Sequence, residues 1–372
     1  MTRSSRDWVS LDGEPLRLAE QIVIETMARS DVMSRSDLAA KTQLPRSTLV
    51  SAITSLLARG LISGTDGLTK GPGAGRPSHQ IRLTLADKRL LFVDIDPTSP
   101  QMTLATCRGD IGPSSDVDET FVFADERSAP PSATDLDPAS ALRFQALARA
   151  HSVDAVVVAV PGATRATSSG RAIPKSPSSP SVSGVPVAVE TYANLAAMGE
   201  AWFGTTKSAT NAVYVSARAM VGVGLTLDGR LLRSGSVTNA DLARLSSERQ
   251  AEWRVLHDPA LVRAQGPDST REHAAVNFGR AVGETISNLV TTMEPDTMVI
   301  DGALGDVAQL VADTISAELG YRSRLRSDQL PHVRPSDLGA DAAAFGAVAL
   351  FRDRRLAQLA PAFHSPTVSW SD

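Results

Sequence analysis

The sequence has little cysteine and few aromatic residues. Cys107 is the only cysteine among 372 residues, and Phe, Trp and Tyr together make up 4% of the chain. One thiol cannot form an internal disulfide or a multi-cysteine zinc site within one chain. The residues that end at Cys107, "MTLATC", have the pattern of a strand, so we expect a buried, unreactive thiol.

Long hydrophobic runs are also missing. The longest apolar run, "AVVVAV" (155–160), is far too short to span a bilayer, and no apolar stretch follows the charged start at Arg3. With 42% hydrophobic and 21% charged residues, the chain should fold as two or three compact units. We expect a cytoplasmic protein with no membrane contact.

The charge is unevenly distributed along the chain. The net charge is -4, yet residues 1–89 hold 13 Lys or Arg against 9 Asp or Glu, and the remainder holds 24 against 32. A basic front on an acidic body is typical of a small nucleic-acid module joined to a domain that does not bind DNA.

Helical patterns fill the front of the chain. Residues 15–30 predict a first helix, with Leu18, Ile22 and either Val23 or Met27 at helical spacing. Residues 34–62, "SRSDLAAKTQLPRSTLVSAITSLLARGLI", predict a helix-turn-helix. Its short helix opens with Ser36 as the N-cap candidate. The chain breaks at Leu44-Pro45, with proline at the first position of a second helix that ends at Gly60.

The second helix of this pair has a small, polar outer face. Leu49, Ile53, Leu56 and Leu57 form the predicted buried stripe, and Arg46, Ser47, Val50, Ser51 and Thr54 remain outside. Such a face fits a major groove, where hydroxyls and an early arginine reach base edges and phosphates. The alternative is an interaction module of the same shape. The candidate DNA-binding residues here are Ser36, Arg46, Ser47, Thr48 and Ser51.

A glycine-rich stretch follows between two short predicted strands, "LIS" and "HQIRLTL". It reads "GTDGLTKGPGAGRPS" and carries Lys70 and Arg76. Glycines let a backbone lie close to another surface, and an extended arginine suits a narrow minor groove. We predict a wing in which Lys70 and Arg76 contact DNA, and the alternative is a flexible linker.

Beyond residue 88 the pattern predicts two α/β lobes with a ligand cleft between them. Several spaced motifs resemble the ROK family of repressors and sugar kinases. They are "VDID", "VAVPG", "VAVETYANLAAMGE", "GVGLTLDGRLLRSG", "EPDTMVIDGAL" and the closing "LGADAAAFGAVAL".

The resemblance implies an α/β fold of two parts. Residues 1–84 would form a winged helix-turn-helix, and residues 85–372 a two-lobed, actin-like (ribonuclease H-like) body. Lobe 1 would comprise about 88–200 plus the C-terminal helix, and lobe 2 about 201–345.

The chain departs from the family's nucleotide-binding motifs. The family's Asp-x-Gly-x-Thr phosphate loop corresponds here to residues 94–98, where Asp96 adds an acid and Pro97 removes an N–H. The second glycine-rich turn reads "SARAMVGVG", with Arg218 and Met220 where the family has glycines. Nucleotide binding is therefore not expected.

The sugar-binding and catalytic motifs are altered as well. The family's Glu-Asn-Asp-Ala-Asn corner, whose Asp is the general base, has Thr191 and Tyr192 at its second and third positions. A phenol with a pKa near ~10 is a poor base at neutral pH. In "NADLAR" (239–244), Asp241 replaces the sugar-binding glutamate and Arg244 the zinc-linked histidine, and the family's cysteine cluster is missing. We expect no catalytic residues, no metal and no cofactor.

Three interpretations of the corner at residues 190–194 remain open. Tyr192 fills space as a core aromatic, or the pocket binds something other than a hexose, or the body binds nothing and serves only to form dimers. If an effector binds, the candidate residues are Thr191, Tyr192, Asn194, Asp241 and Arg244.

These features together predict a sequence-specific DNA-binding regulator, most simply a repressor, acting as a homodimer or homotetramer. Its partners would be double-stranded DNA and a small effector, a carbohydrate or a derivative of one. The rival interpretation is an active sugar kinase with a regulatory DNA-binding head, and a third is an architectural DNA-binding protein without a ligand.

Overall fold

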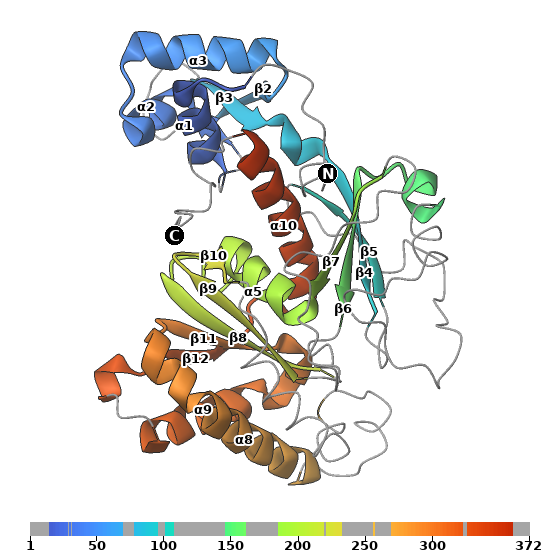
Figure 1. Ribbon diagram of the computed structural model, residues 1–372, viewed down its shortest axis with the longest axis vertical. Coiled ribbons are helices and arrows are strands. Elements are labelled where there is room, and N and C mark those ends of the chain that lie inside the picture. Colours follow the sequence, from blue (N-terminus) through green and yellow to red (C-terminus); the bar gives the residue numbers. More distant parts are fainter. Residues whose placement is uncertain are drawn as a thin grey trace, which may run out of the picture. The chain divides into compact units, whose positions relative to one another are not determined.

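The computed structural model describes residues 15–28, 30, 32–69, 78–95, 101–107, 146–160, 185–218, 221–232, 256, 269–322 and 326–359. The described residues divide into two compact units (Figure 1). The first unit draws on Met1–Arg89, Thr106–Asp110 and Leu350–Asp372, and the second on Leu90–Ala105 and Ile111–Ala349.

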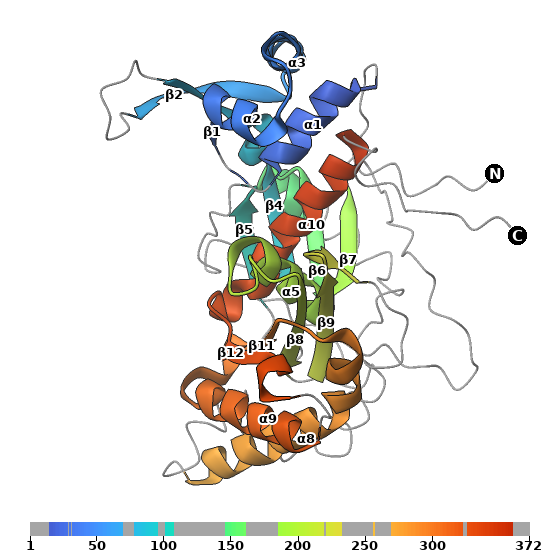
Figure 2. The ribbon, with the colours of Figure 1, turned by 90° about the vertical axis from the view of Figure 1, so that its left-hand side faces the viewer.

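Among the described residues, the first unit contains three complete α-helices, the C-terminal end of a fourth and a small antiparallel sheet. The complete helices are α1 (Leu18–Met27), α2 (Arg35–Thr42) and α3 (Arg46–Ala58), and the strands are β1 (Met33–Ser34), β2 (Ile62–Thr69) and β3 (Ser78–Leu83), followed by the short helix η1 (Thr84–Asp87). The strand order is β1-β3-β2, and β2 and β3 extend away from the helices as a hairpin (Figure 2). This is a winged helix-turn-helix.

The predicted first helix is present as α1, and its buried stripe consists of Val23, Ile24 and Met27, whereas Leu18 is 62% exposed. One predicted core position of this unit, Leu57, is wrong. Leu57 is 38% exposed, because Leu49, Ala52, Ile53 and Leu56 already fill the inner face of α3.

Arg352 is buried within the first unit. It lies on α10 (Ala342–Leu359), and its two terminal nitrogens donate to the carbonyl oxygens of Ala28 at 2.7 Å and Cys107 at 3.3 Å. These bonds connect the C-terminal helix to the end of α1 and to the residue after β5. Cys107 is fully buried, as expected. No helix in the described ranges is long and apolar enough to cross a membrane.

Among the described residues, the second unit contains two sheets. One has the order β5-β4-β6-β7, formed by Gln101–Thr106, Arg89–Asp94, Ala155–Val160 and Val187–Thr191. Strands β4, β6 and β7 are parallel, so Asp94 and Thr191 lie at the same edge of the sheet. Strand β6 is buried at every position, as expected for a strand covered on both faces.

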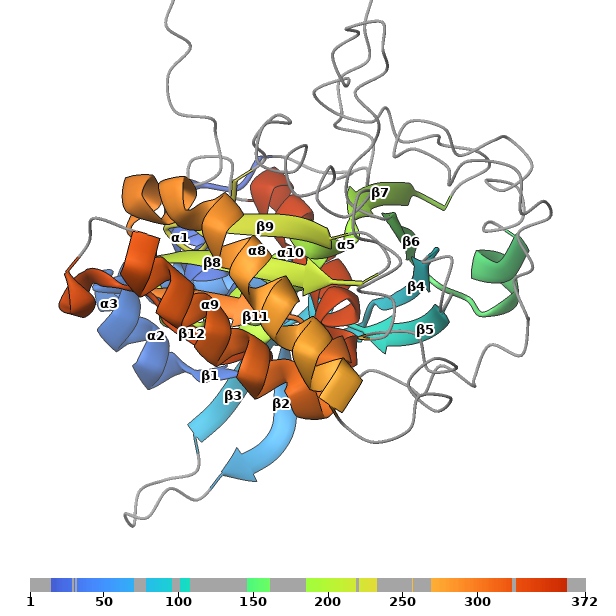
Figure 3. The same cartoon turned by 90° about the horizontal axis from the view of Figure 1, so that it is seen from below.

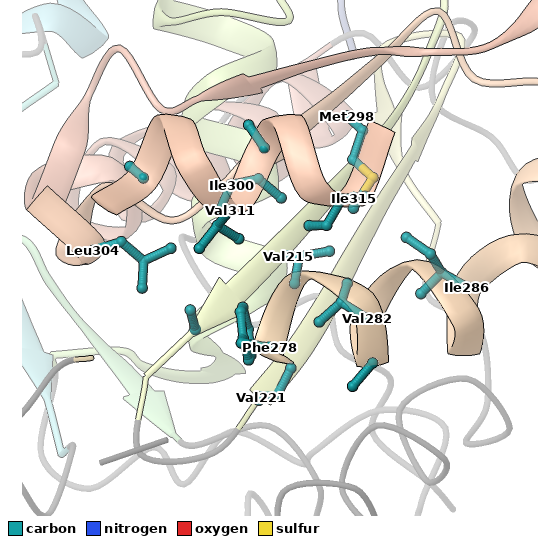
Figure 4. Close-up of a cluster of buried hydrophobic side chains, with 14 of the residues drawn as sticks. Val215, Val221, Phe278, Val282, Ile286, Met298, Ile300, Leu304, Val311 and Ile315 are labelled. Carbon is teal, nitrogen blue, oxygen red and sulfur yellow. The ribbon is translucent and has the colours of Figure 1, made fainter. Parts of the chain in front are cut away.

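The other sheet has the order β10-β9-β8-β11-β12. Its strands are Arg230–Leu231, Val221–Leu227, Asn211–Ala217, Thr297–Ile300 and His332–Pro335. Helices α8 (Ser269–Met293) and α9 (Ala308–Arg322) cover one face (Figure 3), where Val215, Phe278, Val282 and Ile315 belong to one buried cluster (Figure 4). Helix α5 (Tyr192–Phe203) packs against β8 and β9 on the other face. Short helices among the described residues of this unit are η3 (Gly302–Val307), η4 (Ser327–Gln329) and η5 (Gly339–Asp341).

Helices α5 and α10 cross with their backbones in contact. A Cβ atom on Gly346 would overlap the carbonyl oxygen of Leu195, and one on Gly199 would overlap that of Ala342. Glycine is therefore required on both helices for this approach. The crossing fixes α5, which begins at the corner predicted to hold an effector.

Candidate functional site

The start of α2 differs from the prediction by two residues. Ser34 is the N-cap, and it forms a capping box in which its Oγ accepts from the N–H of Asp37 at 3.1 Å and its own N–H donates to Asp37 Oδ2 at 3.0 Å. The Ser34 hydroxyl also donates to Asp37 Oδ2 at 2.7 Å, and this bond, together with the one from the Ser34 N–H, lowers the pKa of the Asp37 carboxyl. Ser36 is not the cap because it lies in the first turn of α2, exposed, with its Oγ 2.7 Å from that of Ser34.

The outer face of α3 is confirmed. Arg46, Ser47 and Ser51 are exposed, and Thr48 is half-buried. Pro45 stands one position earlier than predicted, as the N-cap, and its side chain forms no capping hydrogen bond. The first turn of α3 therefore presents backbone N–H groups beside Arg46, Ser47 and Thr48.

The two wing strands are present. Strands β2 and β3 pair from Ile62 opposite Leu83 to Thr69 opposite Ser78. Lys70 and Arg76, the two predicted wing contacts, lie in residues 70–77, outside the described part of the chain.

At the corner between β7 and α5, two predicted effector residues take part in local hydrogen bonds. Thr191 is the N-cap of α5, and its Oγ1 accepts from the N–H of Asn194 at 3.3 Å. The Asn194 side-chain amide donates to Glu190 Oε1 at 2.9 Å. Both residues are half-buried and serve first to start the helix.

Tyr192, Arg218 and Asp94 come together from three separate elements. The guanidinium of Arg218, just after β8, lies 2.6 Å from Asp94 Oδ2 at the end of β4. The same guanidinium stacks on the ring of Tyr192, with its Cζ 4.2 Å from the ring centroid. The carboxylate balances the charge of the guanidinium, and the aromatic ring stacks on its planar face.

Two buried phenols lie in the same region. The hydroxyls of Tyr192 and Tyr214 are buried without a hydrogen-bond partner among the described residues. Burial raises the pKa of both phenols well above the ordinary value, and the nearby Asp301 carboxylate raises it further, whereas Arg218 acts in the opposite direction. Asp301 is fully buried, and Ser216 Oγ donates to it at 3.1 Å. Neither phenol can act as a base near neutral pH.

Several residues of this site were not predicted from the sequence. Asp301 follows β11 directly, and a carboxylate at the end of a parallel strand is a signal that could have identified it. Tyr214 and Ser216 lie inside β8, where nothing in their pattern marked them. Asp241, Arg244, Asp96, Pro97 and Met220 lie outside the described ranges. Among the described residues, no cluster of three or more His, Cys, Asp or Glu could hold a metal ion.

Fold and site together define a winged-helix protein with a two-sheet α/β body. Residues 242–354 match the model of the ROK family, which confirms the predicted relationship. A crystal structure of a ROK family transcriptional regulator, a homologue of the E. coli MLC protein, superposes with a TM-score of 0.63 at 16% identity, covering 93% of this chain and 98% of that one. The predicted fold is therefore confirmed.

Two curated proteins also match the sequence. The xylose repressor of Bacillus spizizenii (strain W23) is 24% identical over 189 residues, which cover 44% of this chain and 49% of that protein. The xylose repressor of Bacillus subtilis (strain 168) is 24% identical over 199 residues, covering 46% of this chain and 52% of that protein. The chain thus spans about half the length of the curated relatives it matches.

Proposed function

We propose that this protein is a sequence-specific DNA-binding transcriptional repressor. The observation that carries the proposal is the outer face of α3, where Arg46, Ser47 and Ser51 are exposed beside a two-stranded wing. Helices of this kind enter the major groove with their first residues toward the bases.

The first turn of α3 is suited to the phosphate backbone. Pro45 leaves the opening N–H groups of this 13-residue helix without a side-chain cap, and the first turn carries no acidic residue. The positive end of the helix dipole and the free N–H groups attract phosphate oxygens. Arg46 adds a full positive charge at the same end. Ser36, Thr48, Lys70 and Arg76 complete the proposed DNA contacts.

The proposed boundaries follow the sequence prediction. Residues 1–84 bind DNA, and residues 85–372 form the body that mediates assembly into a homodimer or homotetramer. A two-fold protein recognises an inverted repeat whose half-sites face the same side of the duplex.

The body is proposed to bind a small effector without catalysing a reaction on it. Both curated relatives are named xylose repressors, which supports a carbohydrate or a derivative as the effector class. Thr191, Tyr192, Asn194, Asp241 and Arg244 remain the proposed contacts. Thr191 and Asn194 already form hydrogen bonds at the start of α5. An effector would therefore bind them only through the donors and acceptors that these bonds leave unused.

Three features support the proposal that the body does not phosphorylate sugars. Tyr192 stands at the position of the expected general base. The guanidinium of Arg218 is paired with the carboxylate of Asp94, and the carboxylate of Asp301 lies near Tyr192. Phosphoryl transfer depends on positioning and on stabilising phosphate charge, so restoring one carboxylate should not recover it. A coupled ADP-release assay of the wild type and Tyr192→Asp with glucose, N-acetylglucosamine and N-acetylmannosamine should detect no turnover. Sugar-dependent turnover in either protein would favour the kinase alternative.

The direct test of DNA recognition is selection of genomic fragments by the purified full chain. The wild type should enrich a small set of fragments over random DNA. Arg46→Ala should weaken binding to an enriched fragment by about 1 to 3 kcal/mol if Arg46 reaches a base edge or a key phosphate. Arg326→Ala is the matched control, because Arg326 is 75% exposed and lies in the second unit. Equal enrichment of all fragments would overturn the proposal.

A further inference from the structure

The outer face of α3 carries apolar groups as well as polar ones. Val50 is 47% exposed and Leu57 is 38% exposed, and they are the two exposed large hydrophobic residues of this helix. Serines at 47 and 51 interrupt the apolar surface. An interface with another protein would favour a continuous apolar patch. Single methyl-bearing side chains among short hydroxyl-bearing ones instead suit a partner surface on which polar and apolar groups alternate.

Thr54 adds a methyl group to this face. Its hydroxyl donates to the carbonyl oxygen of Val50 at 2.8 Å, so the hydroxyl proton is used within the helix. Thr54 is exposed, and it lies one turn after Val50, which lies one turn after Arg46. Residues four apart are neighbours on a helix surface. A guanidinium, an isopropyl group and a threonine side chain therefore follow one another along a single ridge.

The major groove offers one apolar group, the C5-methyl of thymine, which small apolar side chains contact. We infer that Val50, assisted by the methyl group of Thr54, reads a thymine methyl in each half-site of the DNA that α3 enters. This inference rests on the proposed DNA-binding function and assigns one base of its target. Because α3 carries no acidic residue, no negative side chain of this helix repels the phosphates as the ridge approaches the duplex.

The test removes only the methyl group. Each thymine of an enriched duplex is replaced in turn by deoxyuridine, and affinity is measured with the wild-type full chain and with Val50→Ala. Burial of one methyl-sized group predicts a roughly four-fold loss for the wild type at one thymine per half-site. Val50→Ala should bind the parent duplex more weakly and show no further loss at that position. Alanine favours helix, so the variant should fold, which circular dichroism checks.

Leu232→Ala provides the matched control, because Leu232 is an exposed apolar residue (36%) outside α3. It should keep the wild-type response to deoxyuridine. If the wild type binds its fragment but no replacement weakens binding, the inference is wrong while the DNA-binding proposal stands. The inference is equally wrong if Val50→Ala remains as sensitive as the wild type. If the wild type enriches no fragment at all, the proposed function itself fails.

Discussion

Arg218 and Asp94 form a 2.6 Å ion pair although they are 124 positions apart in the sequence. The side chain of Asp94 is 3% exposed and that of Arg218 is 12% exposed. The pair connects the end of β4 in one sheet of the second unit to the end of β8 in the other. It also places a positive charge over the ring of Tyr192, at the corner where α5 begins.

The ion pair should behave as a coupled unit. Breaking a buried pair by removing one partner typically costs about 3 to 5 kcal/mol, whereas replacing both partners costs much less. We expect Arg218→Met and Asp94→Asn each to lower the free energy of unfolding on the order of 3 kcal/mol. The double variant should be more stable than the sum of the single effects predicts, as measured by urea unfolding. Additive effects would mean that the two side chains do not depend on each other.

Tyr192→Phe should be nearly neutral or stabilising. The Tyr192 hydroxyl is buried without a hydrogen-bond partner among the described residues, so its removal abolishes an unfavourable burial. Tyr192→Ala should instead cost about 3 to 5 kcal/mol, because it leaves a cavity where an aromatic ring packed. Thermal unfolding of the two variants separates the contributions. A loss of more than about 1 kcal/mol in the phenylalanine variant would show that the hydroxyl has a stabilising partner.

Gly346→Ala should destabilise the protein by at least about 2 kcal/mol, because the new methyl group overpacks the crossing of α5 and α10. The atom would overlap the carbonyl oxygen of Leu195, which is backbone and cannot rotate away. Gly320→Ala in α9 is the control, since its methyl group would meet Leu330 at an ordinary 3.6 Å. The control should gain up to about 1 kcal/mol from helix propensity. Similar unfolding midpoints for both variants would contradict the close crossing.

The capping box of α2 predicts a pH dependence. Hydrogen bonds from Ser34 lower the folded pKa of Asp37 below its value of 3.8 in model compounds. Their contribution to stability is therefore present above the unfolded pKa and is lost as the pH falls through the folded pKa. Ser34→Ala should raise the pKa of Asp37 and cost about 1 kcal/mol through the lost cap. NMR titration should detect the shift in Ser34→Ala but not in Ser36→Ala, and equal shifts in both variants would contradict the assignment of Ser34 as the cap.

Local pattern was sufficient to predict the winged helix and the two-sheet α/β body. The spacing of Leu49, Ile53 and Leu56 identified the inner face of α3, and it left Arg46 and the two serines outside, as observed. The errors concern the position of single residues within correctly predicted helices. Two serines two positions apart can each cap a helix, and only the pairing of β1, with Ser34 opposite Gln80, fixes the start of α2.

The body site was less predictable, because its contacts join distant parts of the chain. The sequence identified Arg218 as a departure from glycine and Tyr192 as a departure from a base, but no local pattern brings Arg218 onto Asp94 and Tyr192 together. Asp301 approaches them because β8 and β11 are parallel neighbours in one sheet. Such proximity arises from strand order, which spacing along the chain does not encode.

The central claim is that the protein represses transcription by reading DNA through α3. Its most direct test is run-off transcription of an enriched genomic fragment from its own promoter, with the full chain added at concentrations that saturate the site. We expect the wild type to lower the yield of transcript from this fragment and not from a copy whose binding site is scrambled, and Arg46→Ala to restore the yield. Equal transcription from both templates at full occupancy of the site would show that the protein does not repress through this contact.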